Sequence, residues 1–358
     1  MSAFSEFCLV ALLLFVWESV WWIPLRGVCV SRAVGSGKLR ILEAGRWFST
    51  KSSGAVFASW LPGSGHVMPC QALPLVVDSQ DRWLLQRDDG SYQLIAAPAW
   101  TDIRWQAPHL IVGDSKVKLT SGRLLAEFFR GKERGLTPAE SLRAAWRCSL
   151  STARARAAWQ RWRLSTASLR LMQPLLAAGF VSGLVAYGLD GEKFPLLIFL
   201  AWLWLTMVMI AGQVWFLGRR VYRANRGEIL LDAVLCAIVP FHAMRAAENV
   251  SRHAFGHLHP YAFVARDDKN HPWLRKQIRH LLHPRPGRRD DVILLDAMRP
   301  WLDDWFLRQG LTAADFTSAP QTAAEDGETH YCPRCHGWYL SSASQCRECG
   351  GYELRALG

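Results

Sequence analysis

Long apolar runs interrupt an otherwise polar chain of 358 residues. They cover residues 7–25, 171–189 and 194–217; the second and third contain no charged residue, and the first contains only Glu18. A helix of about 20 residues crosses the roughly 30 Å of hydrocarbon in a bilayer. The pattern therefore predicts three transmembrane helices. One is an N-terminal anchor within residues 1–30, and the other two form a helical hairpin over residues 171–217.

The first run could instead belong to a cleaved signal peptide. Residues 1–7 contain no Lys or Arg, and no small-residue cleavage site follows the run, so two hallmarks of a signal peptide are missing. We therefore expect a retained anchor. Glu18 lies towards the end of this run, and we expect its carboxylate to reach the membrane interface.

Basic residues flank the runs asymmetrically. Those that follow the first run are Arg26, Arg32, Lys38 and Arg40, and none precedes it. Seven arginines lie between Arg143 and Arg170, ahead of the second run, and the third run is followed by Arg219, Arg220, Arg223 and Arg226. The positive-inside rule then places the N-terminus and the short loop after residue 189 outside, and the soluble segments in the cytoplasm. We expect an integral protein of the bacterial inner membrane.

A fourth apolar stretch, residues 229–244, is short for a span and contains Asp232 and Pro240. Glu228, Asp232 and Cys236 recur every four residues, which places them on one face of a helix. This spacing favours an amphipathic helix, either in a protein core or at the membrane surface, over a membrane span.

Residues 31–120 read as strands, because short runs of β-branched and aromatic residues alternate with turn signals. One hairpin is predicted around Asp88-Asp89-Gly90 and another around Gly113-Asp114. We expect a small β-rich cytoplasmic domain here.

Residues 121–170 form a basic segment with helical spacing. Thr137 to Glu140 has the order of an N-cap, a first-turn Pro and a capping-box Glu, and predicts a helix that continues towards the second run. We expect Arg161, Arg163 and Arg170 at its end to bind anionic lipids. Interleaved tryptophans also suggest nucleic acid, but the membrane orientation already accounts for much of the chain's net charge of +12, so nucleic acid is not the expected partner.

Residues 218–311 are predicted to be helical and are rich in histidine. His253, His257 and His259 could share a metal ion, with Asp267 or Asp268 as a further ligand. The set is loosely similar to the histidine boxes of membrane di-iron hydroxylases, but it lacks their adjacent His-His pair, and the chain lacks their usual four spans. The alternative is a His-rich cytoplasmic surface. Residues 312–329 then read as a flexible linker.

The strongest signal lies in residues 330–358. Two CxxC pairs, Cys332 with Cys335 and Cys346 with Cys349, are separated by ten residues, and four thiolates make a closed tetrahedral site for Zn²⁺. The CPxC and CxxCGG forms resemble the zinc ribbon family. That resemblance implies all four cysteines as ligands of a structural zinc ion. A redox pair is the competing interpretation, which a reducing cytoplasm disfavours.

These features predict an α+β membrane protein with three transmembrane helices, a β-rich domain and a zinc ribbon. No complete catalytic motif is present, so we expect a non-enzymatic scaffold or sensor that binds a protein partner through its cytoplasmic domains. A membrane-associated metalloenzyme that uses the histidines is the alternative. A transporter is a third possibility, for which three spans with a single acid are too few unless the chain oligomerises.

Overall fold

The computed structural model describes residues 3–22, 28–32, 39–43, 65–68, 75–86, 92–106, 109–118, 122–189, 195–318, 328–340 and 342–356. The chain divides into two compact units. The first comprises Met1–Ala72, Leu119–Leu125 and Ala153–Pro260, and the second comprises Leu73–Lys118, Ala126–Thr152 and Tyr261–Gly358. Outside the described residues lie the predicted turn at 88–90, the loop at 190–194, the segment 319–327 and the side chain of Glu18.

Two helices in the first unit are long and apolar enough to cross a membrane, namely α6 (Ala167–Leu189) and α7 (Leu196–Phe216), which continues through a π-helical turn (Leu217–Val221). Two glycines of α6, Gly179 and Gly183, lie against the rings of Trp202 and Phe199 in α7, where a Cβ atom would collide. Small residues thus let the two helices approach closely, as is common in membrane bundles.

The prediction of three spans is corrected to two among the described residues. The N-terminal run does form helix α1 (Ala3–Trp22). It is not one of the two helices that meet the length and composition of a span among the described residues. The expected position of the N-terminus outside the membrane depended on that first crossing.

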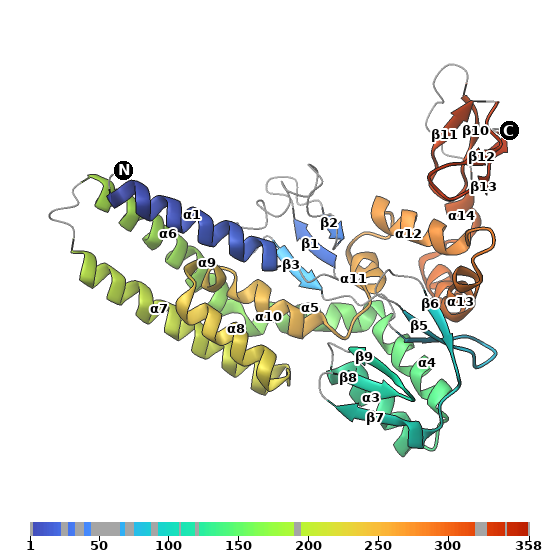
Figure 1. The fold of residues 1–358 in the computed structure, drawn as a ribbon, viewed down its shortest axis with the longest axis horizontal. Helices are drawn as coiled ribbons and strands as arrows, with labels where there is room; N and C mark the ends of the chain where they lie inside the picture. Colours follow the sequence, from blue (N-terminus) through green and yellow to red (C-terminus); the bar gives the residue numbers. More distant parts are fainter. Residues whose placement is uncertain are drawn as a thin grey trace. The chain divides into compact units, whose positions relative to one another are not determined.

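The fourth apolar stretch forms α8 (Arg226–Ile238), followed by the short α9 (Pro240–Ala243) and by α10 (Ala246–Phe255). Helix α8 packs beside α7 along its length (Figure 1). Its inner face buries Asp232 and Cys236 of the predicted set, whereas Glu228 in the first turn is only partly buried.

The single helix predicted from Pro138 onwards is wrong. The segment forms α4 (Pro138–Ser149), α5 (Thr152–Ser165) and α6, with breaks at residues 150–151 and at Thr166. The Trp301 indole donates to the Leu150 carbonyl over 2.8 Å, and the Thr166 hydroxyl donates to the Trp162 carbonyl over 2.7 Å. The Trp301 indole gives the Leu150 carbonyl a partner at the first break. At Thr166 the backbone keeps its i→i−4 bonds, and the hydroxyl adds a second bond to the Trp162 carbonyl. The arginines of this segment therefore do not lie on one rigid rod.

Strands in the N-terminal third fall into three antiparallel sheets. In the first unit, β1 (Val28–Arg32) pairs with β2 (Leu39–Glu43) and β3 (Gly65–Met68). In the second unit, one sheet contains β4 (Leu75–Val77), β5 (Trp83–Gln86) and β6 (Tyr92–Ile95), and the other contains β7 (Ile103–Gln106), β8 (His109–Val112) and β9 (Ser115–Lys118). The pairings β5–β6 and β8–β9 confirm both predicted hairpins.

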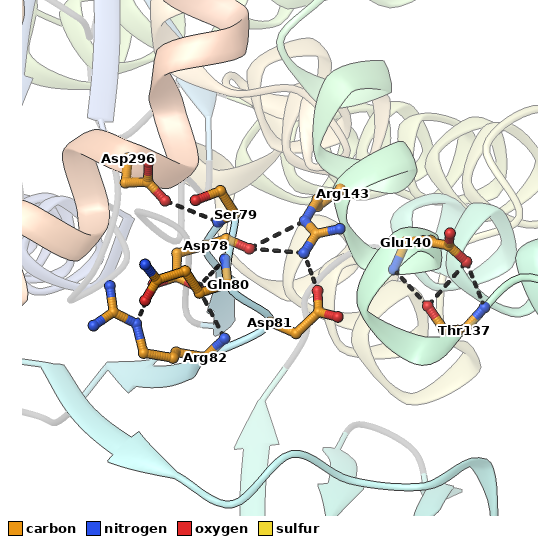
Figure 2. Close-up of polar contacts among 9 residues, drawn as sticks. All are labelled: Asp78, Ser79, Gln80, Asp81, Arg82, Thr137, Glu140, Arg143 and Asp296. Atoms are coloured by element: carbon orange, nitrogen blue, oxygen red, sulfur yellow. Dashed lines mark hydrogen bonds and ion pairs between the residues drawn. The ribbon is translucent and has the colours of Figure 1, made fainter.

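A polar network ties the β4–β5 turn to two helices of the second unit (Figure 2). Arg143 of α4 donates to the Asp78 carbonyl and pairs with Asp81, while Asp296 of α13 (Arg289–Gln309) accepts the Ser79 amide over 2.8 Å. Asp78 caps the turn from within by accepting the Gln80 and Arg82 amides.

The predicted capping box at the start of α4 is present. The Thr137 hydroxyl accepts the Glu140 amide, and the Glu140 carboxylate accepts the Thr137 amide over 2.9 Å (Figure 2). Each bond satisfies a backbone donor that the first helical turn leaves open.

The division between the units falls within α3 (Gly122–Glu133). The second unit continues with the helices α11 (Pro260–Asp267), α12 (Pro272–Leu282) and α13 (Arg289–Gln309), and it ends in a small β module. A short α14 (Ala314–Thr317) lies in the segment predicted as a linker. Phe316 explains this order, because its ring is buried between Trp305 and Phe306, with centroids 5.9 and 5.2 Å away.

Candidate metal centre

The C-terminal module is a small β structure with two tight turns. Strand β10 (Glu328–Tyr331) pairs with β11 (Trp338–Leu340) and β14 (Arg355–Ala356), and β12 (Gln345–Cys346) pairs with β13 (Tyr352–Glu353). Cys332 follows β10 and Cys346 ends β12, so each pair of cysteines opens at the end of a strand and closes in the turn after it.

The two CxxC turns share one backbone feature. The residue after the second cysteine is left-handed in both, with φ of 60° at His336 and 72° at Gly350. In the first turn, the His336 amide donates to the Cys332 carbonyl over 2.8 Å. In the second, the Gly351 amide donates to the Cys346 carbonyl over 3.0 Å. Glycine adopts this conformation without steric cost, which accounts for the glycines after Cys349. Both turns therefore fold each pair of thiols towards one point.

The four sulfur atoms, from Cys332, Cys335, Cys346 and Cys349, all lie within 4.8 Å of one another. The Cys335 and Cys346 sulfurs are 3.7 Å apart. A zinc tetrahedron with Zn–S bonds of about 2.3 Å has S···S edges of about 3.8 Å, so the arrangement fits a four-thiolate site. All four thiols are free, and three are buried. The geometry is that of a metal site rather than of a disulfide, whose sulfurs are about 2 Å apart.

The pKa values of Cys335 and Cys349 are raised when no cation is bound. A hydrogen bond with Cys332, together with burial, raises the pKa of Cys335 well above its usual range. Burial, and then the neighbouring charge of Cys335, raises the pKa of Cys349 to about 12. Several thiolates cannot share this small volume without a positive ion, and a coordinated metal ion supplies it.

The surroundings of the cluster are basic. Tyr352 bonds the His283 ring over 2.9 Å, and Arg334, within the first turn, lies 3.9 Å from Asp291. Burial, followed by the charges of Arg355 and Arg334, lowers the pKa of His283 to about 4. Four thiolates around a divalent zinc ion carry a net charge of about −2, and this basic environment offsets it.

The histidines predicted as a second metal site are not brought together. Within the described ranges, the cysteine cluster is the one set of three or more His, Cys, Asp or Glu side chains close enough to hold a metal ion. His253 instead contacts Asp232, with Nε2 and Oδ2 2.9 Å apart. His259 is buried, and that burial lowers its pKa to about 3. Asp267 pairs with its neighbour Arg266.

Sequence reasoning missed the partners of Asp232. His253 is 21 residues away, and His242 Nε2 lies 3.8 Å from the second carboxylate oxygen of Asp232. The inward position of Asp232 was readable from the four-residue spacing, but the histidines that meet it were not, because they come from separate elements. No family model, curated protein or solved structure matches the chain.

Proposed function

We propose that this chain is a membrane protein that holds one zinc ion in its C-terminal ribbon and uses the ribbon as a non-enzymatic scaffold or sensor for a protein partner. The observation that carries the proposal is the cluster of four thiols within 4.8 Å of one another. Zn²⁺ fits an all-thiolate tetrahedron, and four protein ligands leave no open position for substrate. The metal is therefore structural.

The membrane part of the proposal is supported by α6 and α7, whose lengths and apolar composition suit a helical hairpin. Arginines precede α6 and follow α7, so the positive-inside rule places both flanks in the cytoplasm. Arg161 and Arg163 are exposed close to the start of α6, which supports binding of anionic lipid headgroups.

A protein partner is proposed for the ribbon because it exposes apolar and aromatic side chains on a small, rigid module. Leu340, at the end of β11, is exposed, and Trp338 and Tyr339 beside it are partly exposed. Aromatic residues on a metal-fixed strand lose little conformational entropy on binding, which suits recognition of another protein.

Metal analysis of the detergent-purified chain tests the proposal. We expect one zinc ion per intact chain and none in the variant Cys346→Ser/Cys349→Ser. The matched control is Cys8→Ser/Cys148→Ser, which removes two free cysteines outside the ribbon and should keep the zinc. Iron or a second metal that persists in the ribbon variant would overturn the proposal and favour a histidine-dependent metalloenzyme.

A further inference from the structure

Beyond its first turn, helix α8 carries apolar side chains on its outer face as well as on its inner face. Its outward side chains beyond the first turn are apolar and strongly exposed: Leu230 by 53%, Leu231 by 59%, Val234 by 46% and Ile238 by 65%. Its inward face buries Ile229, Ala233 and Cys236 together with Asp232, which is only 7% exposed. A helix in contact with water carries polar and charged residues on its outer face, which α8 lacks beyond its first turn.

The outward face of α8 continues the surface of α7. The two helices lie side by side in the same unit (Figure 1), and their close approach begins where Ile229 packs against Gly218. Leu205 and Met209 of α7 are also more than half exposed. Because α8 runs along α7, the two helices are surrounded by the same medium.

The inward side chains find their partners within the bundle. Asp232 contacts His253 over 2.9 Å. One helix further on, Gln173 of α6 donates to the Glu248 carboxylate over 2.6 Å and to the Met244 carbonyl over 2.7 Å. Ionisable groups at membrane depth behave in this way, turning inwards and pairing with one another.

The length and the end of α8 also suit a partial crossing. Its 13 residues span about 20 Å, which is less than the roughly 30 Å of a hydrocarbon core. The chain then breaks at Val239, and residues 241–251 are all buried. Irregular backbone is tolerated at membrane depth only where protein covers it.

We propose that α8 is a re-entrant helix that enters the bilayer beside α7 and contacts lipid acyl chains through Leu230, Leu231, Val234 and Ile238. The buried α9 and α10 return the chain to the side from which it came. This inference rests on the proposed membrane position of α6 and α7.

Photolabelling by lipid separates the two proposals. The full-length chain is reconstituted in vesicles that contain a phospholipid with a diazirine on its acyl chain, illuminated and digested with trypsin. Cleavage after Lys or Arg yields residues 194–219 from α7, residues 227–245 from α8, and residues 290–308 from α13. The α13 peptide is the matched control, because it carries exposed Val292 and Leu307 outside the proposed membrane region.

We expect the α7 and α8 peptides to be labelled to a similar extent and the α13 peptide to remain unlabelled. If only the α7 peptide is labelled, the re-entrant assignment fails while the membrane position stands. If neither is labelled, both proposals fail. If the α8 peptide is unlabelled and a separate bifunctional cross-linker joins it to a second copy of the chain, its apolar face is a dimer interface, and the lipid assignment is overturned.

A charged substitution gives a second test. Leu231→Asp should remove most of the chain from the folded membrane fraction, because a charge at hydrocarbon depth shifts insertion by on the order of a hundredfold. Leu307→Asp makes the same change at an exposed leucine of α13 and should leave the folded membrane fraction unchanged. Equal yields from the two variants would contradict lipid contact at Leu231. The photolabelling of the unmodified chain decides the question if the Leu231 variant fails to fold.

Discussion

Removal of zinc should unfold the ribbon while leaving the rest of the second unit folded. The buried core of the ribbon consists chiefly of Cys332, Cys346 and Cys349 themselves. The side chains packed against them, which include Tyr339 and Tyr352, are only partly buried. Full burial of one large apolar side chain contributes about 1.5–3 kcal/mol, and partial burial contributes less. A structural zinc site contributes about 10–16 kcal/mol at pH 7, so the metal contribution exceeds the packing contribution.

Hydrogen exchange measures this difference at particular amides. The amides of Cys332, His336 and Gly351 donate to backbone carbonyls within the two turns at 2.8–3.0 Å. Each 1.4 kcal/mol of lost stability speeds exchange about tenfold. Chelation of zinc should therefore reduce protection of these amides by more than about a thousandfold, until they exchange like an open chain. Amides in the middle of α13 should keep their protection.

The Cys349→Ser variant should reproduce the effect of the chelator without its side reactions, and Cys148→Ser should leave exchange unchanged. Protection that stays within about tenfold of the zinc-loaded value after complete removal of the metal would refute the reasoning. In that case the ribbon would be held by its own packing and by the contact of His283 with Tyr352.

Three further changes test the packing of the second unit. Thr137→Ala removes the capping box of α4 and should lower the free energy of unfolding by about 1 kcal/mol in denaturant titration, unless solvent already satisfies the open amides. Trp301→Phe leaves the Leu150 carbonyl without its 2.8 Å donor and should lower the free energy of unfolding by about 1–3 kcal/mol. The same change at partly exposed Trp338 should lower it by less. Equal losses would argue against the bond. Burial alone would raise the pKa of Asp296, but the hydrogen bonds from the β4–β5 turn lower it overall below 3.8. Its carboxylate therefore stabilises the folded state above pH 3.8, and this contribution is lost as the pH falls through the folded-state pKa. The variant Asp296→Asn should flatten that part of the acid unfolding curve. An unchanged curve would exclude the carboxylate as the cause.

Features that depend on neighbouring residues could be predicted from the amino-acid sequence. The uninterrupted apolar runs became α6 and α7, because membrane-length helices need only composition and length. The hairpin around Gly113-Asp114 and the capping box at Thr137 formed as predicted, because their hydrogen bonds join residues a few positions apart. The two CxxC pairs likewise indicated a four-thiol cluster, since each turn is local and the strands between them are short.

Contacts between side chains that are far apart in the sequence became apparent only in the folded molecule. The helix from Pro138 ends at Leu150 because Trp301, 151 residues later, supplies a donor to its carbonyl. Asp232 faces inwards, where it contacts His253. His253 therefore does not form a metal site with the histidines near it in sequence. Such contacts depend on how helices pack, and the choice of partner is not encoded in the spacing of either residue. Helix α8 is a further example, because its packing against α7 determines that Asp232 faces inwards while Leu230 and Leu231 face outwards.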